Sequence, residues 1–344
     1  MAASALLVLA SATSCGVHEW PDASAGDGMY GLDLVFDTDL PQWDQTEEGR
    51  ASIVPDTRDR RESGFIRHIV RAYPIRNGAP LDIPSDEFIF TEDVAKGYDC
   101  FLTLRLNPGD YRLLVWSDLA ESKTAAPYYQ ADDFSEITLA PGPHAGNTDY
   151  RDAFRGWTDI TVEDYRTGGT HELPSVTVTM ERPLAKFEFV TTDLADFLDK
   201  ESKRLARESA IPRSGSLNDY RIVFYYTGFM PSAYSFNTDQ PTNAETGVEF
   251  TSTLREFGNG EASLGFDYVF VRGDLESSVT VQIGIFDAVS GQRLSLSRSI
   301  RVPLQRSRHT VIRDAFLLMD SDGGIGIDPG YDDDFNITFP FLPY

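Results

Sequence analysis

The alternation of apolar and polar residues on both sides of Pro183 is the strongest constraint on the fold. Val176, Val178 and Met180 alternate with threonines, which predicts a strand with one buried face. Pro183 cannot donate a hydrogen bond to a sheet, so it interrupts this run. The alternation resumes over residues 185–189. We interpret the stretch as the last strand of one β domain followed by the first strand of the next, which divides the chain after residue 183.

Length and composition agree with two β-rich domains. The chain has 344 residues, enough for two domains of about 150 residues each. Its 27 glycines and 19 prolines favour many turns, and 41% of the residues are hydrophobic, which argues against wholesale disorder. The formal net charge of -24 repels phosphate backbones, so we predict that nucleic acid is not a partner.

The first residues predict an exported protein. Residues 1–15 are apolar and uncharged, and small residues lead into Cys15. A cysteine directly after such a stretch resembles a bacterial lipoprotein signal, in which the Cys15 thiol would carry the lipid. The alternative is a plain secretory signal with an incidental cysteine. Residues 16–28 then predict a flexible tether.

A strand over residues 30–37 is followed by an unusually long polar stretch. Leu32, Leu34 and Phe36 share one face of the predicted strand. Residues 38–64 are charged and rich in turn formers, and a stretch of this length is too long for an ordinary connection. Its arginines, Arg50 among them, would be easy targets for an arginine-specific protease, because nicking concentrates in exposed loops. The simpler interpretation is an inert surface loop.

Further strands are predicted along both halves, with a single helix. The expected strands are 65–75, 98–106, 110–119, 136–139, 220–227, 248–254, 265–271, 278–287, 293–302 and 309–319. Apolar residues at helical spacing predict a surface helix over 193–209, with Thr192 or Asp193 as its cap. The fold class is therefore all-β, with antiparallel sandwich domains over 29–183 and 184–344 and one helix in the second.

The sequence carries no recognisable catalytic motif. None of the five histidines pairs with another at metal-ligand spacing, and nucleotide-binding and hydrolase motifs are absent from the sequence. We therefore predict no enzymatic activity, no cofactor and no metal. His68 and Cys100 fall on predicted strands, where packing is their ordinary role. Trp116 likewise fits a core better than a sugar-stacking platform.

An acidic stretch near the C-terminus leaves one metal alternative open. Carboxylates cluster on turns over residues 320–334, and such clusters suit calcium. Their spacing does not fit the EF-hand loop, so solvated turns are the simpler interpretation.

Four segments, taken in order, resemble one known family. Residues 106–119 (LNPGDYRLLVWSDL) resemble the Pro-Gly hairpin of fimbrial subunit lipoproteins from Bacteroidales, and residues 180–193 (MERPLAKFEFVTTD) resemble their domain junction. Residues 225–250 and 323–337 resemble segments of their second domain. The resemblance extends from about residue 29 to residue 337, and Asn107 departs from the family pattern.

The resemblance implies two transthyretin-like β-sandwiches on an outer-membrane lipoprotein of a type V pilus. In that family, subunits join by strand exchange: an arginine-specific protease removes an N-terminal strand from stalk subunits, and the C-terminal strand of a neighbour fills the groove. Anchor subunits resemble the stalk but remain attached to their lipid. Here residues 30–36 would occupy the exchange groove, and Arg50 would be the cleavage position. Cleavage would distinguish a stalk subunit from an anchor. The tail 335–344 alternates as a donated strand would, but Pro340 and Pro343 favour a tail that closes its own sheet.

The leading hypothesis is thus a structural one. The chain is predicted to be an anchor or accessory subunit of a fimbria, with a lipid, palmitate included, on Cys15 in the outer membrane and with other pilus subunits as partners. The alternative is an outer-membrane lipoprotein that binds glycans, because exposed aromatic side chains on β-sandwiches can stack on sugars.

Overall fold

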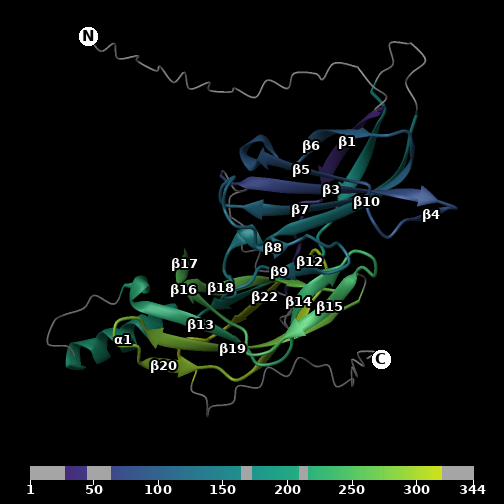
Figure 1. Cartoon of the computed structure of the whole chain (residues 1–344). Coiled ribbons are helices and arrows are strands. Elements are labelled where there is room, and N and C mark those ends of the chain that lie inside the picture. The colour runs from purple at the N-terminus through teal and green to yellow at the C-terminus, as the bar shows by residue number, and fades with distance from the viewer. Residues whose placement is uncertain (1–27, 45–62, 164–172, 209–215, 274, 320–344) are drawn as a thin grey trace, which may run out of the picture.

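The computed structural model describes residues 28–44, 63–163, 173–208, 216–273 and 275–319 (Figure 1). Over these residues the chain is mainly β, with a single α-helix, so the predicted all-β class is confirmed. Cys15, Arg50, the acidic stretch 320–334 and the tail 335–344 lie outside the described residues.

Two facing sheets form the upper half in Figure 1. The smaller sheet has the order β11-β1-β6, with β1 (Gly28–Phe36), β6 (Cys100–Leu106) and β11 (Ser175–Met180). The larger sheet contains β3 (Phe65–Arg76), β4 (Ala79–Pro80), β5 (Asp86–Asp93), β7 (Gly109–Ala120) and β10 (Ala153–Val162). Alternating apolar residues of both sheets, such as Leu34, Leu104 and Val115, meet between them in one core.

A second pair of sheets forms the lower half. One sheet has the order β17-β18-β12-β22-β2, with β2 (Gln42–Asp44), β12 (Leu184–Thr191), β17 (Arg255–Gly258), β18 (Glu261–Phe270) and β22 (His309–Asp314). The other contains β13 (Tyr220–Tyr226), β16 (Glu249–Thr253), β19 (Ser277–Asp287), β20 (Arg293–Leu296) and β21 (Ile300–Leu304). Phe187, Phe224 and Ile283 lie in the core between them.

The helix α1 (Leu194–Glu208) packs on the second core. It buries Leu194, Phe197 and Leu205, which fall on one face at helical spacing. Its position confirms the helix predicted over 193–209. The carboxylate of Asp193, a predicted cap, accepts hydrogen bonds from the backbone amides of Leu317 and Leu318 (3.3 and 3.0 Å).

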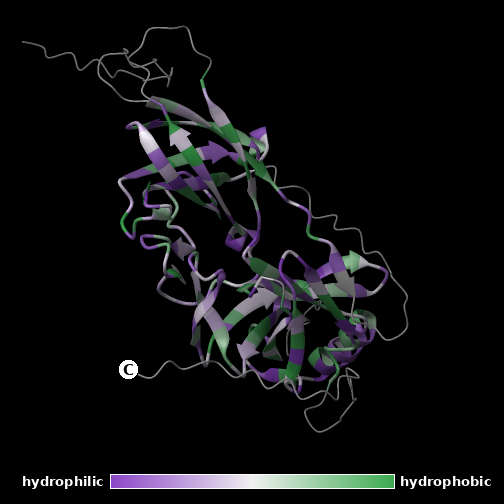
Figure 2. Cartoon of the chain, turned by 90° about the vertical axis from the view of Figure 1, so that its right-hand side faces the viewer, coloured by the Kyte–Doolittle hydropathy of each residue, from purple (hydrophilic) through white to green (hydrophobic). Residues whose placement is uncertain are grey.

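A third core lies between the two halves. The sheet β15-β14-β9-β8 combines β8 (Tyr129–Gln130) and β9 (Ile137–Leu139) with β14 (Met230–Ser235) and β15 (Gln240–Glu245). Around it, Trp116 and Tyr129 pack against Tyr234 and Phe270. Figure 2 shows how hydrophobic and hydrophilic residues alternate along the strands of both halves.

Strands therefore pair across the predicted domain boundary. β2 pairs with β22, and β9 pairs with β14, although residue 183 separates the partners in the sequence. The division into domains 29–183 and 184–344 stays a prediction.

Some predicted strand limits were wrong. The strand predicted over 293–302 is interrupted between β20 and β21, where the Ser297 hydroxyl accepts a hydrogen bond from the amide of Ile283 (2.9 Å). The strand predicted over 309–319 ends at Asp314, because the chain turns toward Asp193. The strands β2, β4, β5, β8, β10, β14, β15 and β17 were not predicted. Within the described residues, the 3-10 turns Val94–Lys96 and Asp149–Arg151 lie between strands, and Leu217–Asp219 lies between α1 and β13.

Candidate functional site

The strand β1 occupies the middle of its sheet, in a position we call the β1 slot, between β6 and β11. Seven residues from Gly28 to Leu34 pair with β6 in antiparallel register. Six residues from Gly31 to Phe36 pair with β11 in parallel register. β1 is thus paired on both sides.

The side chains of β1 alternate between core and outer face. Leu32 and Leu34 are fully buried, and Phe36 is 8% exposed. The ring of Phe36 meets the ring of Phe154 edge-on, with centroids 5.1 Å apart. Val35 points outward and is 38% exposed. Removing β1 would expose a long apolar strip of the first core to water, so the slot requires an occupant.

Gly31 is the point of closest approach in the slot. A Cβ atom at this position would lie 2.4 Å from Cζ of Phe101 and 2.8 Å from Cβ of Ser175. The Phe101 ring, on β6, therefore covers the glycine, and Ser175 on β11 closes the other side. A side chain at this position would require the Phe101 ring and the Ser175 side chain to shift.

The chain that leaves the slot is held by an arginine from the interval between β11 and β12. The guanidinium of Arg182 donates to the carbonyl oxygens of Asp37 (3.2 Å), Thr38 (3.1 Å) and Asp39 (2.9 Å). It also binds both carboxylate oxygens of Asp152 at 2.9 to 3.1 Å. We call Arg182 and Asp152 together the carbonyl clasp.

The clasp is buried and remains charged. Arg182 is 5% exposed, and its guanidinium lies 4.6 Å from the centroid of the Phe154 ring. Burial acts to lower the pKa of Arg182, but the Asp152 carboxylate outweighs it, so the pKa is raised. The guanidinium is therefore a permanent cation with three donors aimed at the main chain after β1.

A second set of ion pairs joins the two halves beside the clasp. Arg151 donates to Oδ1 of Asp267 (2.6 Å), and His144 and Tyr226 contact Oδ2 of the same carboxylate (2.6 Å each). Lys186 binds Asp149 at 2.8 Å. Burial alone would raise the pKa of Asp267, but Arg151 and His144 lower it. Asp149 and Arg151 thus hold two positions of the second half, Lys186 and Asp267, and the adjacent Asp152 holds Arg182.

His68 and Cys100 lie near each other behind β1 but are poorly suited to nucleophilic chemistry. Nε2 of His68 lies 3.5 Å from Sγ of Cys100, and Nδ1 lies 2.8 Å from the Ser117 hydroxyl. Burial lowers the pKa of His68 to about 4 and, with Glu92 and other carboxylates, raises the pKa of Cys100 to about 12. A neutral imidazole beside a protonated thiol does not form the ion pair that activates a cysteine. Packing, the role predicted for both residues, fits this geometry.

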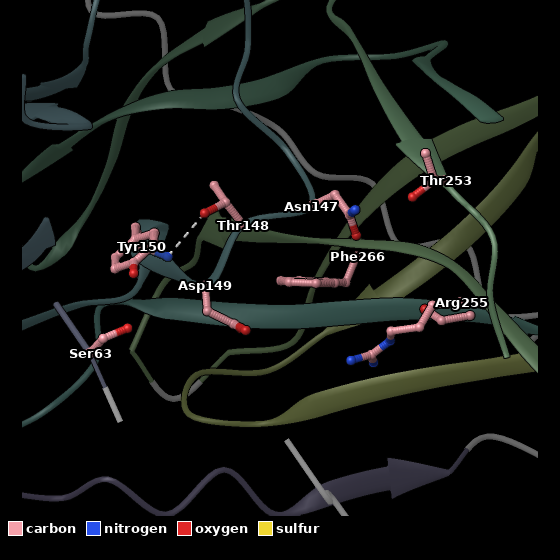
Figure 3. Close-up of a pocket in the computed structure, with 9 residues that line it drawn as sticks. Ser63, Asn147, Thr148, Asp149, Tyr150, Thr253, Arg255 and Phe266 are labelled. Carbon is pink, nitrogen blue, oxygen red and sulfur yellow. Dashed lines mark hydrogen bonds between the residues drawn. The ribbon is translucent and has the colours of Figure 1, made fainter. Parts of the chain in front are cut away.

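A polar pocket of about 410 Å³ opens beside the junction (Figure 3). Figure 3 shows Asp149 and Arg255 on opposite sides of the pocket, with Phe266 between them. Asp149 already binds Lys186 (2.8 Å) and the hydroxyl of Tyr268 (3.0 Å). Because its carboxylate is paired within the protein, this pocket is a weaker candidate than the β1 slot.

The predicted site residues have different outcomes. Cys15 and Arg50 lie outside the described residues, so lipidation and cleavage stay predictions. Trp116 is fully buried and donates to Asp118 (3.1 Å), as a core residue would. Trp157 is 52% exposed, with the Arg112 guanidinium 4.8 Å from its ring centroid. Arg182 was not singled out from the sequence, although an arginine directly before the interrupting Pro183 was a visible signal.

The part of the chain that the structure describes adds two findings. It holds no group of three or more histidine, cysteine or acidic side chains arranged to bind a metal ion. None of its helices combines the length and the apolar character needed to span a bilayer.

The fold and the slot define a class of all-β protein with several, mostly antiparallel, sheets, in which the first described strand is the central strand of a mixed sheet. The chain belongs to a family described as "Family of unknown function (DUF6562)", whose profile matches residues 27–340. No curated protein matches the chain in sequence.

Several solved structures are similar to the chain. The fimbrial anchor protein Mfa2 from Porphyromonas gingivalis is 12% identical, with a TM-score of 0.36 over 78% of this chain and 82% of that one. A fimbrial assembly protein from Parabacteroides distasonis is 12% identical, with a TM-score of 0.34 over 86% and 93%. The tip fimbrial protein Mfa3 from Porphyromonas gingivalis is 10% identical, with a TM-score of 0.34 over 80% and 81%. Likenesses of this size do not define a function.

Proposed function

We propose that this chain is a surface-anchored structural subunit of a fimbria, in an anchor or accessory position, and that it joins its neighbours by exchange of a β-strand. The observation that carries the proposal is the position of β1, an N-terminal strand paired on both sides in the middle of a sheet. In this proposal Cys15 carries the lipid in the outer membrane. Cleavage at Arg50 would separate β1, together with the lipidated Cys15, from the rest of the chain and open the slot to a neighbour's strand. An uncut chain would keep both the lipid and β1 and end the polymer.

An engineered disulfide tests exchange at this slot. Leu34 lies directly opposite the native Cys100 in the antiparallel register of β1 and β6, at a spacing that two cysteines can bridge with small adjustments. A Leu34→Cys variant, once oxidised, would fix β1 in its slot. We expect cells that express it to lose the fimbriae seen by electron microscopy, and to recover them under a reductant.

The matched control for this test is Leu34→Cys combined with Cys100→Ser, which has the same truncated side chain but no partner thiol. It should assemble in both conditions. Fimbriae that persist while the disulfide has formed completely would overturn strand exchange at this slot.

Deletion of the gene tests the fimbrial role itself. We expect fewer or detached fimbriae on the cell surface, with recovery when the wild-type gene is restored. A Cys15→Ser variant should accumulate in the culture medium instead of the membrane fraction. Unchanged fimbriae after deletion would count against the proposal, whatever the membrane fraction shows.

The exposed Trp157 supports glycan binding as the second candidate function. Its indole projects from the outer face of β10, with the Arg112–Asp159 ion pair (2.7 Å) beside it, an arrangement that could stack on a sugar and bind its hydroxyls. Binding of the purified protein to an immobilised glycan array would favour this function if the signal disappears with Trp157→Ala.

A further inference from the structure

The carbonyl clasp binds a part of the chain that the β1 slot does not include. The last residue of β1 to pair with β11 is Phe36. Arg182 donates to the next three carbonyls in succession, those of Asp37, Thr38 and Asp39. A strand that filled only the slot would leave these three donors without their main-chain acceptors, so the incoming strand would lose three hydrogen bonds to a charged group.

The clasp is held in place by residues that do not belong to the segment it binds. Asp152 fixes the guanidinium through three hydrogen bonds, and the ring of Phe154 lies beneath it. The neighbouring Glu181 exchanges two backbone hydrogen bonds with Arg155, at 2.8 Å each. Residues 28–44 make none of these contacts, although the Phe154 ring also packs on Phe36. The clasp would therefore keep its geometry when another strand with an apolar side chain in place of Phe36 replaced them.

Beyond the clasp the same chain joins a second sheet. The amide of His309 donates to the carbonyl of Pro41 at 3.1 Å, and β2 then pairs with β22 in parallel register. β22 belongs to the sheet of the second half. Residues 28–44 therefore run through three successive sites: the β1 slot, the clasp and the side of β22 that faces away from β12.

We propose that the docking track for an incoming strand comprises all three of these sites, and that Arg182 is the positioning residue that sets its length. This inference rests on the proposed strand exchange. The occupant of the docking track is an extended segment of a neighbouring subunit. It is as long as residues 28–44, and apolar residues alternate with other residues in its first part. Because the clasp binds main-chain oxygen only, it selects the length and path of that segment and leaves its side chains there free.

Peptide exchange into a nicked chain tests the inference. The full chain receives a specific protease site between residues 45 and 62 and is cut after folding, so that the segment before the cut can be displaced. Three labelled peptides compete for its place: residues 28–36, which fill the slot; residues 28–40, which add the clasp; and residues 28–44, which add β22. We expect the peptide concentration that gives half-maximal incorporation to be at least about tenfold lower for the second peptide than for the first.

The Arg182→Met variant distinguishes the effect of the clasp on binding from the effect of a longer peptide. It should reduce the difference between the first two peptides to less than about threefold, because methionine makes no hydrogen bond to the carbonyls. Arg71→Met is the matched control. Arg71 is also buried, lies 4.4 Å from the ring centroid of Phe134 and donates to the carbonyl of Asp132 (2.6 Å), but it does not contact residues 28–44. It should leave the difference unchanged.

The outcomes distinguish the inference from the function on which it rests. If the peptides 28–36 and 28–40 enter equally well, strand exchange stands and the role of Arg182 is overturned. If no peptide enters, both fail. Arg182→Met alone leaves the Asp152 carboxylate buried without its partner, which could prevent folding. In that case the double variant Arg182→Met with Asp152→Asn replaces it, because it also removes this charge. A retained tenfold difference in that double variant would equally overturn the inference.

Discussion

At the scale of single residues, a glycine and a buried histidine shape the β1 slot. Gly31 passes under the ring of Phe101, where no side chain fits. His68 lies in the core behind β1 and is fully buried. Both residues stabilise the closed slot without touching solvent, so substitutions at these positions act on the stability of the fold.

Gly31→Ala should lower the free energy of unfolding by roughly 1 to 3 kcal/mol, the range for overpacking. The Phe101 ring can move away, but the Ser175 Cβ atom is fixed to β11. The double variant Gly31→Ala with Phe101→Ala should therefore recover only part of the stability that Gly31→Ala loses. The control is Gly228→Ala, because the nearest atoms to a Cβ there are 3.9 Å away. Urea denaturation measures the three variants, and equal stability of Gly31→Ala and Gly228→Ala would contradict the tight fit.

His68 should make the stability of the protein depend on pH. Because burial lowers its pKa from 6.5 to about 4, the unfolded chain binds a proton there that the folded chain does not bind between these values. The folded state therefore loses stability as the pH falls from about 6.5 to about 4, by up to about 3 kcal/mol from this group. Above pH 6.5 the contribution is constant.

The His68→Gln variant checks this dependence, because it lacks the titrating group. Its free energy of unfolding, measured from pH 4 to pH 8 by chemical denaturation, should fall less steeply toward acid than that of the wild type. Parallel curves for the two proteins would show that His68 does not titrate in this range.

At the scale of elements, the turn Asp149–Arg151 with the following Asp152 acts as the joint between the halves. Its residues reach β12 through Lys186, β18 through Asp267 and the clasp through Arg182. Ion pairs this deeply buried cost desolvation energy, so they contribute orientation more than net stability. Removing one partner leaves the other charge buried and unpaired.

Asp267→Asn should be one of the most damaging single substitutions in the described part of the chain. It leaves the buried Arg151 without its carboxylate, which we expect to cost roughly 3 to 5 kcal/mol. The matched control, Asp159→Asn, breaks the exposed pair with Arg112 and should cost less than about 1 kcal/mol. Guanidinium denaturation of the two variants gives the comparison, and similar losses would show that burial of the junction is not decisive.

At the scale of the whole molecule, the third core makes the two halves mutually dependent. Trp116, Tyr129 and Phe270, which come from opposite sides of Pro183, have less than 2% of their surface exposed. β2 and β9 add backbone pairing across the same boundary. The halves therefore share buried surface that neither could cover alone.

We expect the chain to unfold in a single cooperative transition. In calorimetry the van't Hoff and calorimetric enthalpies should agree, since separation of the halves would expose the third core. Phe270→Ala should lower the free energy of unfolding by roughly 3 to 5 kcal/mol and with it the melting temperature. It should still unfold in a single transition. Two separate transitions in the wild type would contradict the dependence of the halves on each other.

The alternating residues determined much of this protein by themselves. The strands β1, β3, β6 and β7, the helix α1 and the all-β class follow from local periodicity, which requires no knowledge of the partner strands. Strands such as β5 and β15 were missed because their residues are mostly half-buried or exposed, so alternation is weak there. The central place of β1 was implied by a resemblance, and the structure shows that β1 pairs on both sides.

Only the tertiary structure decided which residues meet across long separations. The sequence marks Arg182 as a charged residue before a proline, but its three carbonyl partners lie more than 140 positions away. Long separations also divide β2 from β22, and Asp267 from Arg151 and His144 by 116 and 123 positions. Local patterns record which face of a strand is buried, whereas the partner of a buried charge is fixed by the packing of whole sheets.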